Sequence, residues 1–363
     1  TRRSSDLEVI NAQMHANVFV EARFARGLDD AGHALEFFEV VGLFNRAALR
    51  RELAERRHRR QLLARQYSVR IVKEWPDAAA DRDVAMLALH ARRSADSIRA
   101  WARERGVEPR GGSPGLAVVM TGTDLYQDIL SDRKAKQSLD AAQRLVVLQE
   151  QGVAALPAPH RPKARVVFQS TPARTPLPKT ERWLRLVMVG HLRAVKSPQT
   201  LMEAARHLAG RADIRIDHIG EALAPEWEEA ALETMLALPT YRWLGALSHG
   251  RTRLAIARAH ALVHTSAMEG GAHVIMEAVR SGTPVLASRV GGNVGMLGED
   301  YEGYFPHGNA ARLAALLARC RDEQTRTDGL LARLRGQCEF RAPLFDAQHE
   351  RAALLQLLQE ITP

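Results

Sequence analysis

Two glutamates, Glu269 and Glu277, stand eight residues apart, and the pair Gly270 and Gly271 directly follows the first of them. The apolar run before them and the apolar spacing after them predict a strand, a loop and a helix over residues 261–280. A diglycine that opens a helix leaves backbone N–H groups at the positive end of the helix dipole, which suits a phosphate group. Both carboxylates can then reach one ligand across the helix start, and Glu277, two turns into the helix, suits sugar hydroxyls.

A basic loop follows the predicted strand over residues 184–189. It begins at Gly190 and continues through His191 and Arg193 to Lys196. Two cations, Arg193 and Lys196, can neutralise an anionic group such as a phosphate, which is the work that a divalent metal does elsewhere. We therefore expect a phosphate-binding loop and no metal or other cofactor.

Further glycines end the neighbouring strands. Gly220 and Gly245 close the predicted strands at 214–219 and 241–245. The segment 291–295 contains three more glycines and Asn293, and it predicts a second glycine-rich turn able to approach phosphate or sugar closely.

The first half of the chain has its own polar strand ends. His90 ends a continuous apolar strand, and Ser94 could cap the helix that follows. The strand ending at Met120 leads into a loop with hydroxyls and an acid. Arg92, Arg93, Ser94 and Ser97 at the first strand end predict an anion pocket. The second loop, with Thr121, Gly122, Thr123 and Asp124, is expected to face the same cleft.

Strands that alternate with helices position all of these residues. Apolar strands are predicted at 34–42, 67–73, 84–89, 116–120, 145–148 and 166–168, and again from 184 onwards, with helices between them, including one over residues 16–30. This alternation predicts an α/β chain with two open, doubly wound, Rossmann-like domains that bind ligand at the carboxyl ends of their strands.

Composition shifts divide the chain. The expected parts are an N-terminal extension (1–33), a first Rossmann-like domain (34–172), a proline-rich linker (173–183), a second Rossmann-like domain (184–340) and a C-terminal segment (341–363) whose helix could cross back to the first domain.

Charge and cysteine usage limit the partners. The chain of 363 residues has a formal net charge of +9, and residues 42–73 carry ten basic against two acidic side chains, or +8. The helix expected over 46–66 could touch an anionic membrane surface without inserting, or be a solvated arginine-rich face. No aromatic residues interleave it, so nucleic acid is not the expected partner. The two cysteines are not spaced like the ligands of a metal site, which favours free thiols in a reducing cytoplasm. No apolar run is long enough to span a bilayer. A cytoplasmic protein is therefore expected.

The two chemistry-bearing segments of the second half resemble those of retaining glycosyltransferases with the GT-B fold. Glu269 and Glu277 match the family's E-x7-E motif, and residues 190–196 resemble its G-R-L-x-x-x-K loop. The resemblance implies two Rossmann-like domains that face a central cleft, Glu269 on the donor sugar and Glu277 on the nucleotide ribose. It implies a donor site formed by Gly190, His191, Arg193, Lys196, Gly220, Gly245, Glu269, Gly270, Gly271, Ala272, His273 and Glu277.

Five segments together resemble a narrower group, the selenosugar synthases of selenoneine biosynthesis. They are Ala-Leu-His-Ala-Arg-Arg-Ser-Ala-Asp-Ser (88–97), Thr-Gly-Thr-Asp-Leu-Tyr (121–126), Val-Leu-Gln-Glu-Gln-Gly (147–152), Val-Gly-His-Leu-Arg (189–193) and Met-Glu-Gly-Gly-Ala-His-Val-Ile (268–275). The resemblance implies that selenium from selenophosphate attacks the anomeric carbon of UDP-N-acetylglucosamine or UDP-glucose. It implies catalytic roles for Glu269, Arg193, Lys196 and His90, and acceptor contacts from Arg92, Arg93, Ser94, Thr121, Gly122, Thr123, Asp124 and Asn293.

One segment departs from the family. Its first strand normally leads into a loop rich in Asn and Gly, whereas this chain has Gly42-Leu-Phe followed by Asn45. Two other functions stay open: a conventional glycosyltransferase acting on a carbohydrate or lipid, and a non-catalytic protein that binds a nucleotide sugar or nucleic acid.

Overall fold

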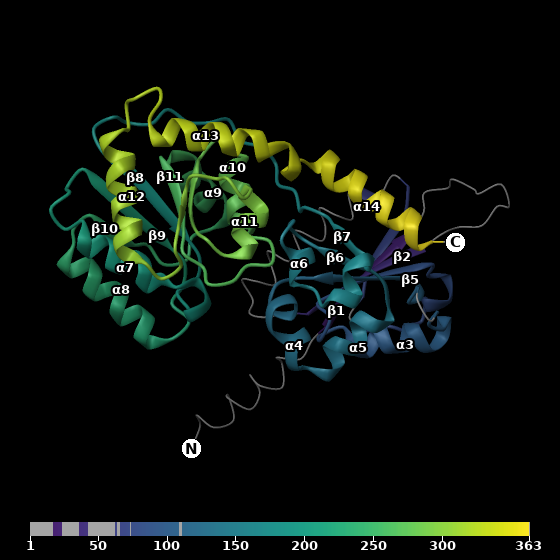
Figure 1. Ribbon diagram of the computed structural model, residues 1–363. Coiled ribbons are helices and arrows are strands. Elements are labelled where there is room, and N and C mark those ends of the chain that lie inside the picture. Colours follow the sequence, from purple (N-terminus) through teal and green to yellow (C-terminus); the bar gives the residue numbers. More distant parts are fainter. Residues whose placement is uncertain are drawn as a thin grey trace, which may run out of the picture. The chain divides into compact units, whose positions relative to one another are not determined.

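A computed structural model describes residues 17–23, 36–42, 62–63, 66–72, 74–108 and 111–362 of the chain. These residues form two compact units: the described residues up to 167 together with 350–362, and residues 168–349 (Figure 1). Asn45 and most of the expected basic helix over 46–66 lie outside the described residues.

A seven-stranded sheet in the order β1-β3-β2-β4-β5-β6-β7 organises the first unit. From β2 through β4, β5 and β6 to β7 each strand pairs in parallel with the next, while β1 pairs antiparallel with β2 and β3. The helix predicted over residues 16–30 is therefore wrong, because β1 occupies part of that range. The strands are β1 (Asn17–Arg23), β2 (Glu36–Gly42), β3 (Ser68–Ile71), β4 (Ala85–Leu89), β5 (Ser113–Met120), β6 (Ala142–Val147) and β7 (Ala164–Val166).

Helical segments cover this sheet. They are η1 (Ala80–Arg82), α3 (Ala95–Arg105), η2 (Asp124–Asp128), α4 (Ile129–Ser131), α5 (Arg133–Ala141), α6 (Gly152–Ala155), η3 (Ala158–Lys163) and α14 (Ala347–Ile361). All five residues of β4 are buried, as expected for a central parallel strand whose two faces are both covered. One face packs on Trp101 of α3, and the other on Leu354 and Leu358 of α14.

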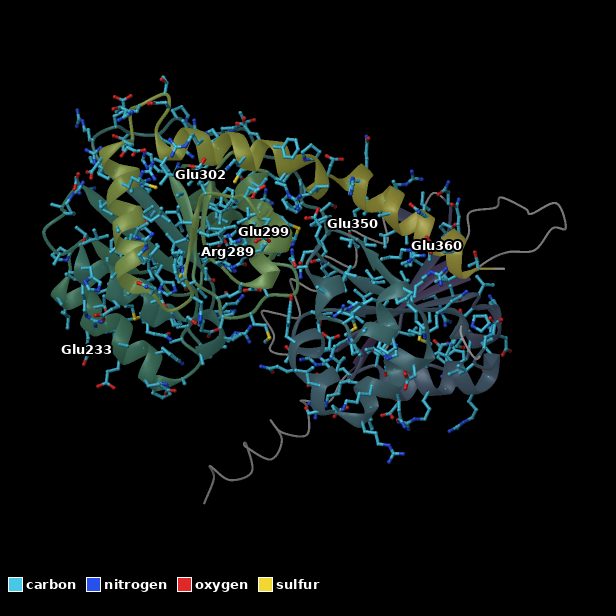
Figure 2. The ribbon with its side chains drawn as sticks, viewed as in Figure 1. Glu233, Arg289, Glu299, Glu302, Glu350 and Glu360 are labelled. Carbon is cyan, nitrogen blue, oxygen red and sulfur yellow. The ribbon has the colours of Figure 1, made fainter. Side chains whose placement is uncertain are left out.

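The end of α14 is also held by charge. Glu360, on the last turns of that helix (Figure 2), accepts hydrogen bonds from Nε of Arg144 at 2.7 Å and from Nε of Arg165 at 2.8 Å. Both arginines belong to the β6–β7 edge of the same sheet. From Glu350 onward the last helix of the chain is thus part of the first unit, although residues 168–349 before it belong to the second unit.

A six-stranded parallel sheet in the order β10-β9-β8-β11-β12-β13 organises the second unit. Its strands are β8 (Leu184–Val189), β9 (Ile214–Ile219), β10 (Tyr241–Trp243), β11 (Ala261–His264), β12 (Val285–Ser288) and β13 (Tyr304–Phe305). The order reverses at β8, so the chain winds outward in both directions from that strand.

Two layers of helices enclose the second sheet. α7 packs against α8 and α12, and α10 packs against α9 and α13 (Figure 1). The helices are η4 (Ala194–Lys196), α7 (Pro198–His207), α8 (Pro225–Ala237), α9 (His249–Arg258), α10 (His273–Val279), α11 (Gly291–Leu297), α12 (Ala310–Asp322), α13 (Leu330–Arg341) and η5 (Ala342–Phe345). The predicted α/β class, with largely parallel sheets, is confirmed. Within the described residues, no helix has the length and apolar character needed to cross a membrane.

Candidate functional site

Three glycines at strand ends meet on the sheet of the second unit. The N–H of Gly190 donates to Ile219, and the N–H of Gly220 donates to the carbonyl of Gly245 at 2.8 Å. A methyl group on Gly220 would lie 1.8 Å from the carbonyl oxygen of Gly190. Only glycine permits this approach, so the loops that follow β8, β9 and β10 begin close together, as expected at the carboxyl ends of parallel strands.

The ion pair between Lys196 and Glu269 is at the centre of the predicted donor site. Nζ of Lys196 lies 2.5 Å from Oε1 of Glu269, and Nε2 of His264 lies 3.1 Å from the same oxygen. The three side chains come from η4, from the loop before α10 and from the end of β11. The structure therefore brings together two residues predicted from the sequence, and it adds His264, which was not predicted.

The second oxygen of Glu269 is available to a ligand. Within the described part of the chain, Oε2 has no hydrogen-bond partner, because Lys196 and His264 both contact Oε1. Burial on its own would raise the pKa of Glu269, but the charge of Lys196 and the hydrogen bond from His264 hold that pKa well below its usual range. Glu269 is therefore an ionised acceptor.

Backbone contacts hold the two loops of this ion pair together. The hydroxyl of Thr265 donates to the carbonyl of Lys196 at 2.7 Å, and the N–H of Ala267 donates to the carbonyl of Val195 at 2.9 Å. Ser197, which follows Lys196, adopts a left-handed conformation with φ of 46°. Its hydroxyl lies 2.9 Å from Nε2 of His307. The position of Lys196 is thus fixed at its backbone, and only its flexible stem can move.

Arg193 and His191, the two other predicted residues of the basic loop, do not take part in the ion pair of Lys196 and Glu269. Arg193 is exposed, and its guanidinium has no ion pair or hydrogen bond with the residues that the structure describes. It is a cation available to an anionic ligand. The imidazole of His191 instead accepts a hydrogen bond from the N–H of Glu221 at 3.2 Å, which links the loops after β8 and β9.

Glu277 is buried in α10 and has basic neighbours. Its Oε1 lies 2.8 Å from Nε2 of His249, 3.7 Å from Nε2 of His273 and 4.0 Å from Nη1 of Arg253. Arg253 is itself buried and donates to the hydroxyl of Thr171 at 2.8 Å. Because all three neighbours approach Oε1, Oε2 faces none of them. The diglycine and Ala272 precede α10 directly, with Ala272 at its N-cap position.

Asn293 lies inside the second unit, on α11. The turn predicted over residues 291–295 is wrong, because these residues begin a helix. Nδ2 of Asn293 donates to the carbonyl of Ser288 at 2.9 Å, and its Oδ1 is buried without a hydrogen-bond partner among the described residues. Asn293 therefore braces the end of β12 behind the loop of Glu269.

In the first unit, Asp124 ties two strand ends together. Its fully buried carboxylate accepts from the N–H groups of Ala91 at 3.0 Å, Thr121 at 2.8 Å and Gly122 at 2.9 Å. Ala91 follows β4, and Thr121 and Gly122 follow β5. The carboxylate is occupied by backbone groups, so its role here is to shape the loops. Thr123, one residue earlier, is exposed.

His90 is buried at the end of β4 with a positive φ of 68°. Its Nδ1 accepts from the N–H of Arg93 at 3.4 Å, and its Nε2 lies 3.6 Å from Oδ2 of Asp128. Burial lowers the pKa of His90 more than the facing carboxylates of Asp124 and Asp128 raise it. The imidazole is therefore neutral at physiological pH.

The predicted anion pocket is only partly present. Arg92 is exposed, but it pairs with Asp128 at 3.5 Å and with Asp132 at 3.1 Å. The predicted cap by Ser94 is wrong, because its hydroxyl donates backward to the carbonyl of Leu89 at 2.5 Å. Arg93 is half-buried.

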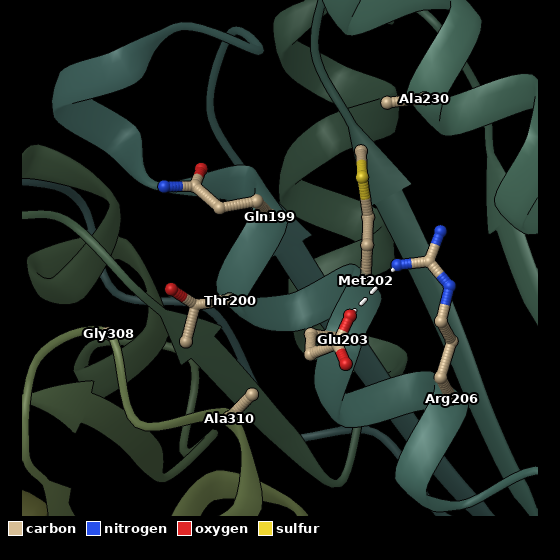
Figure 3. A pocket seen from close by; sticks show the side chains of 8 residues that line it. All are labelled: Gln199, Thr200, Met202, Glu203, Arg206, Ala230, Gly308 and Ala310. Atoms are coloured by element: carbon tan, nitrogen blue, oxygen red, sulfur yellow. Dashed lines mark hydrogen bonds and ion pairs between the residues drawn. The ribbon is translucent and has the colours of Figure 1, made fainter.

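A cavity of about 280 Å³ opens beside α7 in the second unit (Figure 3). Met202 and Ala230 are part of its apolar lining, and Glu203 and Arg206 point toward one another along it, 3.0 Å apart. None of the predicted donor-site residues lines it.

Sequence reasoning missed three residues that contact the predicted donor-site glutamates, namely His264, His249 and Arg253. His264 had a usable signal, since it ends a buried strand of a parallel sheet, where side chains meet ligands. His249 and Arg253 lie on α9, more than twenty residues before Glu277, and no local pattern connects them with it.

Residues 170–329 match the family model described as Glycosyl transferases group 1. No curated protein matches the chain in sequence. Among solved structures, HepE from Anabaena in complex with UDP has a TM-score of 0.62 at 16% identity, with 76% of this chain and 78% of that chain covered. Sucrose-phosphate synthase from Thermosynechococcus elongatus has a TM-score of 0.58 at 19% identity, with 77% and 73% covered.

A variant of TarM from S. aureus, in complex with fondaparinux, alpha-GlcNAc-glycerol and UDP, has a TM-score of 0.57 at 12% identity. The match covers 75% of this chain and 55% of that chain, so this chain spans about half the length of TarM. These neighbours are GT-B glycosyltransferases, and the chain has the GT-B fold predicted from its sequence.

Proposed function

Because residues 170–329 match the family model described as Glycosyl transferases group 1, we propose that this chain is a glycosyltransferase that uses a UDP-sugar as its donor. The choice of UDP is supported by the similar structures of HepE, which were solved with UDP and with UDP-glucose, and of TarM, solved with UDP. It is also supported by the clustering of the predicted donor residues on one edge of the second sheet.

One observation carries the proposal: Glu269 presents an ionised carboxylate whose Oε2 is unoccupied within the described part of the chain, beside the ammonium of Lys196. A sugar hydroxyl can donate to Oε2, while the diphosphate of the same donor accepts from Lys196 and from the exposed Arg193. Charge-assisted hydrogen bonds of this kind are the stronger class. The amides before α10 add backbone donors for phosphate, and Oε2 of Glu277 is the acceptor for a ribose hydroxyl.

Departure of UDP is assisted by these cations. As the bond between the anomeric carbon and the diphosphate oxygen breaks, negative charge develops on that oxygen, and fixed positive groups lower the barrier. Arg193 and Lys196 supply two such charges without a metal. We propose that the reaction requires no metal, so a chelator should leave the rate unchanged.

The acceptor we propose is selenophosphate. The support is the sequence resemblance to selenosugar synthases, together with Arg93 and the neutral His90 at one strand end of the first unit. Selenium attacks the anomeric carbon as the bond to UDP breaks, and water then cleaves the selenium–phosphorus bond. The products are a 1-selenosugar, UDP and phosphate. A selenium anion is already an effective nucleophile and needs little help from a general base.

A second candidate function is transfer to the hydroxyl of a carbohydrate or lipid. The observation that favours it is the pairing of Arg92 with Asp128 and Asp132, since these carboxylates offset the positive charge that an anionic acceptor would use. Such an acceptor would need its hydroxyl proton removed by a general base.

Mass spectrometry of reaction products separates these functions. The pure protein is incubated with UDP-N-acetylglucosamine or UDP-glucose and freshly made selenophosphate, beside a control with ordinary phosphate. A selenium isotope pattern on the sugar, with UDP released, supports the selenosugar reaction. Transfer to a sugar or lipid acceptor but never to selenophosphate would replace it with the second function. UDP binding without any product would leave only a nucleotide-sugar-binding protein.

A further inference from the structure

His264 is a buried side chain in the donor site to which the proposed reaction assigns no role. It is the last residue of β11, and its side chain has 2% of its surface exposed. Nε2 lies 3.1 Å from Oε1 of Glu269. Because the ionised carboxylate can only accept, Nε2 must carry the proton and donate it. His264 is thus a fixed donor beneath the carboxylate.

Lys196 and His264 share one oxygen but differ in mobility. Lys196 reaches Oε1 through a flexible four-carbon stem. This stem lies beside Gly190: a methyl group added to that glycine would be 3.7 Å from Cγ of Lys196, which is an ordinary van der Waals distance. Its Nζ contacts Glu269 and no other side chain of the described residues. His264 is held inside the strand by packing on all sides. One partner can leave the carboxylate, and the other cannot.

A bound diphosphate competes for Lys196. A diphosphate carries more than one negative charge whereas Glu269 carries one, and at equal distance the attraction between charges grows in proportion to charge. Lys196 therefore moves from Oε1 toward the phosphates when the donor binds. The carboxylate of Glu269 is partly removed from water, and it would then lose its main charge partner. A buried carboxylate without a partner raises the free energy of the complex.

We propose that His264 is a positioning residue that keeps Oε1 of Glu269 in place while bound donor draws Lys196 onto its diphosphate. This inference rests on the proposed use of a nucleoside-diphosphate sugar. His264 acts through Glu269 and does not touch the reacting atoms. Without His264 the donor complex still forms, but Glu269 in that complex leaves its position or takes up a proton, so the loss should affect turnover more than the donor concentration needed for half-saturation.

The pH dependence of turnover follows from the groups around Glu269. Burial favours the protonated carboxyl, whereas Lys196 and His264 favour the carboxylate. Gly292 of α11 packs on the backbone of Glu269 and has no charge. Once Lys196 has left, loss of the His264 hydrogen bond raises the pKa of Glu269. Because the reaction needs the carboxylate, the acidic decline of turnover should then move to higher pH.

Two amide variants form a matched pair. In His264→Gln the amide nitrogen is as many bonds from the backbone as Nε2 of histidine, so it can still donate to Oε1. In His264→Asn the amide is one methylene shorter and cannot reach. Both replacements are neutral and polar, so they perturb folding similarly. His207→Ala, at the exposed end of α7, is the control for loss of a histidine outside the site.

The experiment measures kcat and KM for the UDP-sugar across the acidic and neutral pH range. His264→Asn should lower kcat roughly tenfold, as expected for loss of a hydrogen bond to a charged group. Its KM should change little. The acidic limb of its pH–rate profile, where kcat declines as the pH falls, should lie at higher pH than in the wild type. His264→Gln should restore both kcat and the position of the limb. His207→Ala should match the wild type.

Three outcomes overturn the inference. They are an unshifted acidic limb in His264→Asn, equal losses in both amide variants, and a change confined to KM. If the wild-type protein itself transfers no sugar, the proposed function fails, which is a different result from failure of the variants alone. Thermal melting of each variant, with and without UDP, shows that it is folded and binds nucleotide, so a kinetic change is not a folding defect.

Discussion

Gly292 lies against the backbone of Glu269 so closely that a methyl group on Gly292 would be 1.9 Å from the carbonyl oxygen of Glu269. The start of α11 thus forms the floor under the loop of the proposed donor-sugar residue. The contact joins the ends of two neighbouring strands, β11 and β12, through the segments that follow them. A side chain at position 292 must displace this loop.

Gly292→Ala should therefore impair the donor site and lower stability. The clash is with backbone, which cannot rotate away, and overpacking of this kind costs about 1–3 kcal/mol. We expect a lower melting temperature and weaker UDP-sugar binding by calorimetry. The matched control is Gly336→Ala in the middle of α13, where an added methyl group meets no atom within 4 Å. That change should raise stability by up to about 1 kcal/mol. Equal effects of the two changes would contradict the role given to Gly292.

Arg193→Ala should slow turnover. Its guanidinium is exposed and unpaired within the described residues, so it is available to the diphosphate, and removal of one charge-stabilising group lowers kcat by roughly tenfold to a thousandfold. Folding should be unaffected, because no contact is lost. Steady-state kinetics with Arg312→Ala, an exposed arginine on α12, provides the control. Wild-type turnover in Arg193→Ala would remove this residue from the donor site.

Glu277→Gln should weaken UDP binding more than it slows the chemical step. The substitution keeps the shape of the side chain and removes the charge that faces His249, His273 and Arg253. Loss of a charged acceptor for the ribose corresponds to about 1.5–3 kcal/mol, or roughly tenfold or more in the dissociation constant. Calorimetric titration with UDP measures it, beside Glu233→Gln on the exposed face of α8 (Figure 2). An unchanged UDP affinity would exclude Glu277 from nucleotide binding.

Glu360 should make the first unit sensitive to acid. The hydrogen bond from Arg165, followed by that from Arg144, lowers the pKa of Glu360 below its ordinary value of 4.5. A group whose pKa is lower in the folded state stabilises the fold fully above the unfolded-state pKa, and this stabilisation is lost as pH falls through the folded-state pKa. Thermal melting of Glu360→Gln should therefore differ from the wild type at neutral pH and converge with it in acid. A constant difference at all pH values would contradict this.

Strands with continuous apolar runs could be predicted from the sequence. β8 and β9 have the predicted bounds, since both are flanked by residues that end strands and their inward-facing side chains are buried. The glycine-rich segment 291–295 could not be predicted correctly. Glycine disfavours helices by up to about 1 kcal/mol each, but burial of Val294, Met296 and Leu297 against the second sheet outweighs that preference.

The role of a site residue could be predicted from the sequence only where residues close to it in the chain form a recognisable pattern. The spacing of Glu269 and Glu277 and the two cations of the basic loop are local, and the structure places Lys196 on Glu269. Asp124 has the residue type expected of a ligand-binding side chain, but its partners are backbone N–H groups of Ala91, 33 residues away, and of its own loop. Such contacts depend on which strands are neighbours, and a single sequence does not report this directly.

Phosphorus NMR of the complete reaction tests the central claim most directly. The protein is mixed with a UDP-sugar and selenophosphate, and the phosphorus signals of all species are followed together, with samples lacking protein or lacking UDP-sugar as controls. We predict that UDP and phosphate appear in equal amounts as the signals of UDP-sugar and selenophosphate disappear, and that a chelator changes nothing. If UDP appears without loss of selenophosphate, the acceptor is a different molecule. If UDP-sugar stays intact with every acceptor offered, the account of this protein as a UDP-sugar-dependent transferase is contradicted.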